Sequence, residues 1–107
     1  MARIPVLVTD APAPGPGDEV IRLVPPLHAH GAGDECVACA AVGDVRVALY
    51  ELLESRRLTK QPMPARIVVD ISAVPADAAL TRDRIAGRAP ATALRDHVVA
   101  RNFELAG

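Results

Sequence analysis

Residues 10–17 (DAPAPGPG) constrain the fold of this chain more than any other stretch. Three of these eight residues are proline and two are glycine. Proline has no backbone N–H to donate, and its ring breaks helices and central strands, so the segment is predicted to be a loop. The apolar run that precedes it therefore leads into an irregular connection and not into a helix.

Short apolar runs rich in β-branched residues predict the strands of this chain. The predicted strands are residues 3–9 (RIPVLVT), 19–24 (EVIRLV) and 66–71 (RIVVDI). The third run is apolar at successive positions, and this pattern is typical of a strand that is covered on both faces.

Helical periodicity is clearest between the second and third predicted strands. We expect a helix at residues 44–57, with Asp44 as its N-cap and apolar side chains recurring on one face. Two further helices are predicted at residues 77–86 and 91–102. Strand, helix and strand in this order indicate a βαβ unit, so we expect a small α/β domain of two or three layers.

Length and composition restrict the class of protein. A chain of 107 residues is expected to form one domain, and with no Trp, one Tyr and one Phe its core must be built from aliphatic side chains. The net charge of -1 argues against a nucleic-acid binder. No run has the hydrophobic length of a signal peptide or a membrane span, so we expect a cytoplasmic protein without a membrane partner.

The chain has only two cysteines, Cys36 and Cys39, in a Cys-x-x-Cys arrangement. In a reducing compartment this spacing favours metal or redox chemistry over a structural disulfide. His28 and His30 lie just upstream, and two thiolates with two imidazoles form a donor set suited to Zn²⁺. The alternative is that the cysteines are small buried apolar residues and the histidines are solvated loop residues.

From Cys36 onward the chain resembles the metal-motif region of the CobW-type metallochaperone GTPases, a group with HypB- and UreG-like members. Cys36 and Cys39 match the outer cysteines of that family's Cys-x-Cys-Cys motif, whereas Ala38 takes the middle place. Gly43 and Asp44 follow with the family's spacing and lead into the predicted helix.

The resemblance continues through the third predicted strand. Asp70 and Ser72 resemble the end of the family's Walker B strand and its switch, in which Ala73 replaces the glycine. Residues 94–105 are similar to the helix and strand entry that follow in those enzymes. The similarity covers residues 36–105 and the first strand, and it implies a shortened P-loop NTPase fold over residues 1–107.

The residues that hold a nucleotide are missing from this pattern. A phosphate-binding loop needs glycine amides, a lysine and a Ser or Thr, but residues 10–17 stand in its place and acidic Asp18 follows. The only lysine, Lys60, follows the predicted helix, and the only asparagine, Asn102, leaves no Asn-Lys-x-Asp motif. GTP hydrolysis and a bound nucleotide are therefore not expected.

The resemblance implies a non-catalytic metal-binding or protein-interaction module in metal homeostasis. Its ion, Zn²⁺, is expected on Cys36 and Cys39 with His28 or His30, and open sheet edges favour a homodimer or a protein partner. Two alternatives stay open at this point. The chain is either a GTP-binding protein that completes its site with another chain, or a stable remnant without activity.

Overall fold

The computed structural model describes residues 3–25 and 44–106, and in this part of the chain four strands form one parallel sheet in the order β2-β3-β1-β4. The strands are β1 (Ile4–Thr9), β2 (Asp18–Arg22), β3 (Arg66–Asp70) and β4 (Phe103–Leu105). The helices are α2 (Val45–Thr59), α3 (Ala78–Ala86) and α4 (Leu94–Asn102), with a 3₁₀ turn, η1 (Pro75–Asp77), before α3. The expected α/β class is confirmed. None of the described helices has the length and apolarity to cross a membrane.

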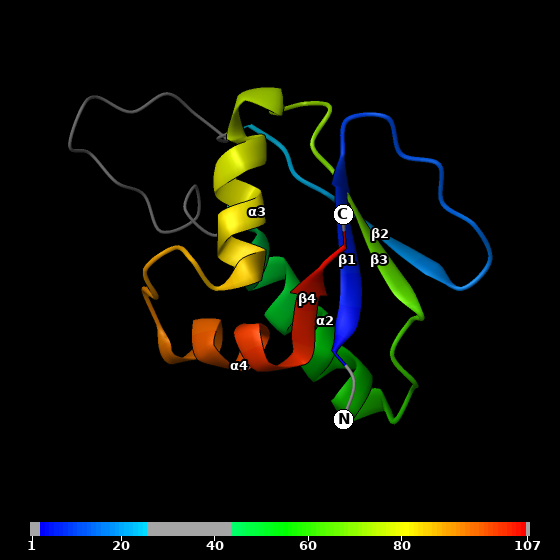
Figure 1. Ribbon diagram of the computed structural model, residues 1–107. Helices are drawn as coiled ribbons and strands as arrows, with labels where there is room; N and C mark the ends of the chain where they lie inside the picture. The colour runs from blue at the N-terminus through cyan, green and yellow to red at the C-terminus, as the bar shows by residue number, and fades with distance from the viewer. Residues whose placement is uncertain (1–2, 26–43, 107) are drawn as a thin grey trace.

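The helices cover one face of the sheet (Figure 1). Alternate strand residues and residues of all three helices join one buried cluster: Val6, Val8, Leu23, Val45, Leu49, Ile67, Val69, Ile71, Ile85, Val99 and Phe103. Because successive strand residues point to opposite faces, the strand members of this cluster all lie on the helix-covered face. The described residues therefore form two layers.

The opposite face of the sheet carries a different set of side chains. The register places Asp18 beside Arg66, Val20 beside Val68 and Arg22 beside Asp70, and these side chains alternate with the core residues of β2 and β3. Figure 1 shows residues 10–17 passing on this side as they connect β1 to β2. The predicted loop is confirmed, and in the described part of the chain no helix lies on this face.

Most of the predicted elements exist, but several bounds differ. The second strand ends at Arg22 and not at residue 24, and α2 runs two residues past its predicted end, to Thr59. The last helix begins at Leu94 and not at residue 91, because Ala93 is extended and the Asp96 carboxylate accepts a hydrogen bond from the Ala93 amide. Strand β4 was expected only through the resemblance, since three residues carry too little periodicity to predict a strand.

Lys60 ends α2 in the left-handed region, with φ 56° and ψ 34°. A β-carbon in this conformation costs about 1 kcal/mol relative to glycine. We expect Lys60→Gly to be more stable to urea unfolding than Lys60→Ala by about this amount. Both variants lose the lysine side chain, so equal stabilities would contradict a backbone origin.

Candidate functional site

The four predicted metal ligands, Cys36, Cys39, His28 and His30, lie outside the described residues. The structure therefore neither brings them together nor separates them. Within residues 3–25 and 44–106, no three His, Cys, Asp or Glu side chains group closely enough to hold a metal ion. We call residues 28–39, which contain these four side chains, the donor segment. The described residues end at Pro25 before it and begin again at Asp44 after it.

Three side chains meet where the parallel strands end. Thr9 and Arg22 flank Asp70 in the register of β1, β3 and β2. Ligands of α/β proteins bind at this carboxyl edge of the sheet. Asp70 is 4% exposed; its Oδ1 accepts from the Ser72 amide at 2.9 Å and its Oδ2 from Arg22 Nε at 3.1 Å.

These hydrogen bonds satisfy Asp70 within the chain. The pKa of Asp70 is lowered, chiefly by the hydrogen bond from the Ser72 amide and then by one from the Ser72 side chain. The Arg22 guanidinium lowers this pKa further. The carboxylate is thus ionised and closes the turn after β3. Asp70 is thus a polar strand end that the neighbouring Ser72 amide and Arg22 satisfy.

Residues 10–17, the connection between β1 and β2, also bond within the chain. The Gly15 amide donates to Asp18 Oδ2 at 2.8 Å, and the Ala11 amide donates to Thr9 Oγ1 at 3.1 Å. The Arg66 guanidinium, and then the Gly15 amide, hold the pKa of Asp18 below its usual range. The Asp18 carboxylate is therefore ionised, and it engages the Gly15 amide within the chain.

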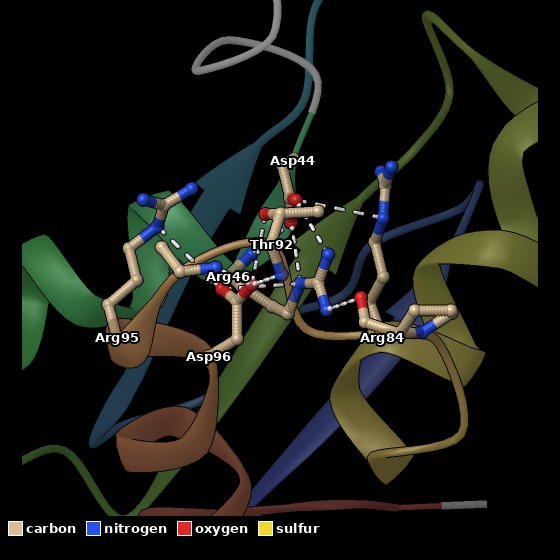
Figure 2. A network of polar contacts seen from close by, with 8 residues as sticks. Asp44, Arg46, Arg84, Thr92, Arg95 and Asp96 are labelled. Atoms are coloured by element: carbon tan, nitrogen blue, oxygen red, sulfur yellow. Dashed lines mark hydrogen bonds and ion pairs between the residues drawn. The ribbon is translucent and has the colours of Figure 1, made fainter.

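The most buried charged residue of the described chain lies at the start of α2. Arg46, 3% exposed, donates from Nε to Asp44 Oδ1 at 3.2 Å and from Nη2 to Asp44 Oδ2 at 3.0 Å. Its Nη1 donates to the Pro90 carbonyl at 3.0 Å, and its Nε lies 3.5 Å from Asp96 Oδ1. Figure 2 shows the guanidinium held between the two carboxylates.

Each carboxylate also orders the backbone at a helix start. Asp44 Oδ1 accepts from the Arg46 amide at 2.9 Å, which confirms Asp44 as the N-cap of α2. Asp96 Oδ2 accepts from the Thr92 amide at 2.8 Å, from the Thr92 hydroxyl at 3.1 Å and from the Ala93 amide at 3.3 Å. Two helix N-termini are thus joined through one arginine.

Further cations surround this network of Asp44, Arg46 and Asp96. Arg84 Nε lies 3.7 Å from Asp44 Oδ2, and Arg95 Nε lies 3.7 Å from Asp96 Oδ1. Burial raises the pKa of Asp96, but the Thr92 bonds and the charge of Arg46 outweigh this effect, and the pKa falls below 3.8. Asp96 is therefore an anion at neutral pH despite its burial.

The network links α2, the α3–α4 connection and α4. Asp44 is the first described residue after the donor segment. Because Asp44 belongs to the network, the network anchors the chain at this point. Sequence reasoning identified Asp44 as a cap but missed its coupling to Arg46 and Asp96. The available signal was a charged residue, Arg46, between the two apolar positions Val45 and Val47 at the start of an amphipathic helix.

Comparison with protein-family models, with curated proteins and with solved structures produced no significant match. The CobW-type resemblance therefore stands on the sequence motifs alone.

Proposed function

We propose that this chain is a non-catalytic, CobW-like domain that binds Zn²⁺ through Cys36 and Cys39, with His28 or His30 completing the site, and presents the ion to a protein partner in metal homeostasis. The donor set carries this proposal: two thiols and two imidazoles fall within residues 28–39, and the chain has only one further histidine. Thiolate and imidazole are the ligands that Zn²⁺ prefers in tetrahedral sites.

The described residues on either side of the donor segment support this role. Leu23, 3% exposed, joins the core and donates its amide to the Asp70 carbonyl at 3.0 Å. Asp44, at the other end, is 8% exposed and bonded to Arg46. A loop with both ends fixed loses less conformational entropy when it closes around an ion, so its affinity is higher.

The absence of catalysis in this proposal is supported by the contacts of two carboxylates. The Asp70 carboxylate is engaged by Ser72 and Arg22, and the Asp18 carboxylate is engaged by Arg66 and Gly15. In a nucleotide site these positions would face Mg²⁺ and phosphate. Here both belong to closed internal contacts.

The proposal predicts a stoichiometric metal site in the reduced protein. Titration with Co²⁺ should give thiolate-to-cobalt absorbance and tetrahedral ligand-field bands at one ion per chain, and Zn²⁺ should displace the Co²⁺. Cys36→Ser and Cys39→Ser should each weaken binding by roughly a hundredfold or more, because each removes a charged ligand.

The third histidine provides a matched control. His97 is exposed on α4, so His97→Gln should bind Co²⁺ like the unaltered protein, whereas His28→Gln or His30→Gln should change the ligand-field spectrum. Binding that survives loss of both cysteines would contradict the assignment. Tight binding of a fluorescent GTP analogue in the absence of metal would instead support the nucleotide alternative.

A further inference from the structure

Strand β2 forms one edge of the sheet, with β3 as its neighbour in the order β2-β3-β1-β4 (Figure 1). The Leu23 amide donates to the Asp70 carbonyl, and Arg22 is the register partner of Asp70. In a parallel ladder, alternate residues direct both backbone groups to the same neighbour. Ile21 and Leu23 therefore face β3, whereas Val20 and Arg22 direct their backbone groups away from it.

The outward backbone groups of Val20 and Arg22 have no partner among the described residues. Val20 is also one of the few large apolar residues with an exposed side chain, at 37%. An edge of this kind is a template for pairing with another strand unless lysine, proline or a bulge protects it. The five residues of β2 (DEVIR) contain neither lysine nor proline.

The other edge is less suited to pairing. Strand β4 has only three residues, and the bond from the Ala106 amide to the Val6 carbonyl at 2.8 Å extends its pairing with β1 by no more than one residue. Very short edge strands are one of the devices by which proteins avoid edge pairing. Strand β2 is therefore the edge that remains competent to pair.

The sequence of β2 is complementary to itself in one antiparallel register. With Val20 opposite Val20 of a second copy, Asp18 lies opposite Arg22 of the second copy, and the reverse pair follows from the twofold symmetry. Val20 then exchanges two backbone hydrogen bonds with its counterpart, because both residues direct their groups outward. Shifts of register lose this match of charges.

The charged residues on this face extend the match across both protomers. Arg66 Nη2 lies 2.6 Å from Asp18 Oδ2, and Arg22 Nε lies 3.1 Å from Asp70 Oδ2. In the twofold register, Asp18 also meets Arg22 of the second copy, so positive and negative side chains alternate over four positions. The Arg22 side chain is 69% exposed and is free to lean toward either carboxylate.

We propose that two copies of this chain associate through β2, edge to edge and antiparallel about Val20, to form one continuous eight-stranded sheet. The main observation behind this proposal is that Asp18, Val20 and Arg22 of the open edge strand are complementary to the same residues of a second, antiparallel copy. The interface joins only two short strands, so the dimer dissociates on dilution. The association does not depend on metal.

Sedimentation velocity from micromolar to millimolar concentration tests this dimer. The metal-free protein should shift from the 11.2 kDa chain to a species of twice this mass. Val20→Pro removes an amide that points away from β3, and proline is tolerated at edge positions, so the protomer should keep its fold while dimer affinity falls roughly tenfold or more. Val20→Lys places two like charges at the twofold axis and should act in the same direction.

Val24 supplies the matched control, because it is 38% exposed but lies beyond the end of β2. Val24→Lys should leave the dimer unchanged, and circular dichroism should show the same fold in all three variants. A protein that stays monomeric at millimolar concentration overturns the proposal. So does a dimer that survives both Val20→Pro and Val20→Lys.

Discussion

Replacing Arg46 by methionine should lower the free energy of unfolding by about 3–5 kcal/mol, because the change takes the nearest cation from two buried carboxylates and leaves them only Arg84 and Arg95, each at 3.7 Å. Asp44 and Asp96 keep their backbone donors, but each loses the guanidinium that lies between them. Single domains are stable by only about 5–15 kcal/mol, so the variant should be close to the limit of folding at room temperature.

Urea unfolding followed by circular dichroism measures this loss, with Arg57→Met as the control on the same helix. Arg57 is exposed and pairs with Glu54 one turn away, a contact that surface screening makes weak. The Arg57→Met control should unfold at the same urea concentration as the unaltered protein. A small loss at Arg46 would show that water reaches the carboxylates when the guanidinium is absent.

A second substitution separates the charge effect from lost packing. Asp96→Asn removes one of the two carboxylates that face Arg46, so Arg46→Met/Asp96→Asn should be less destabilised than the sum of the two single variants, with a coupling energy of about 1–3 kcal/mol. Additive losses would indicate that Arg46 acts mainly through the packing of its methylene groups.

The same ion pair makes the stability difference depend on pH. The pKa of Asp96 is lowered in the folded protein, so its ionised form contributes stability above the ordinary value of 3.8 and loses that contribution as the pH falls through the folded pKa. A protonated Asp96 no longer needs a cation. The gap in stability between the Arg46→Met variant and the unaltered protein should therefore narrow as the pH falls toward the lowered pKa of Asp96 in the unaltered protein.

The strands and helices were predictable because local pattern and global fold agree in this chain. The β-branched run of β3 and the apolar stripe of α2 carry their own periodicity, and the prolines of residues 10–17 exclude a helix. Strand β4 is different, since its three residues are strand only because β1 pairs with them. Tertiary pairing and not local propensity decides that segment.

The polar network was not predictable for a related reason. Arg46 and Asp96 are fifty residues apart, and their meeting depends on how α4 packs against α2. An arginine near the start of a helix usually lies in solvent, so the sequence alone favours the wrong environment. The Cys and His donors are the opposite case. The sequence alone indicates their metal-binding chemistry, but these residues lie outside the described part of the chain.

Replacing Phe103 by alanine should also be severe, with a loss of about 3–5 kcal/mol in the free energy of unfolding. Phe103 is 1% exposed and is the only phenylalanine in the chain. Its amide donates to the Val99 carbonyl at the end of α4, and its register partner is Ile4 of β1. The side chain therefore fills the core where helix turns into strand, and its loss would leave a cavity there.

Thermal unfolding of Phe103→Ala, Phe103→Leu and Leu94→Ala orders these effects. Phe103→Leu retains most of the apolar volume and should cost less than about 1.5 kcal/mol. Leu94 is 85% exposed on α4, so Leu94→Ala should change stability by less than about 0.5 kcal/mol.

If Phe103→Ala were as mild as Leu94→Ala, α4 and β4 would have to unfold separately from the rest of the domain. Hydrogen exchange of the Ala106 amide, which bonds to the Val6 carbonyl, would then be fast in the unaltered protein. We expect slow exchange, because Phe103 ties this edge strand to the same core that holds β1 and β3.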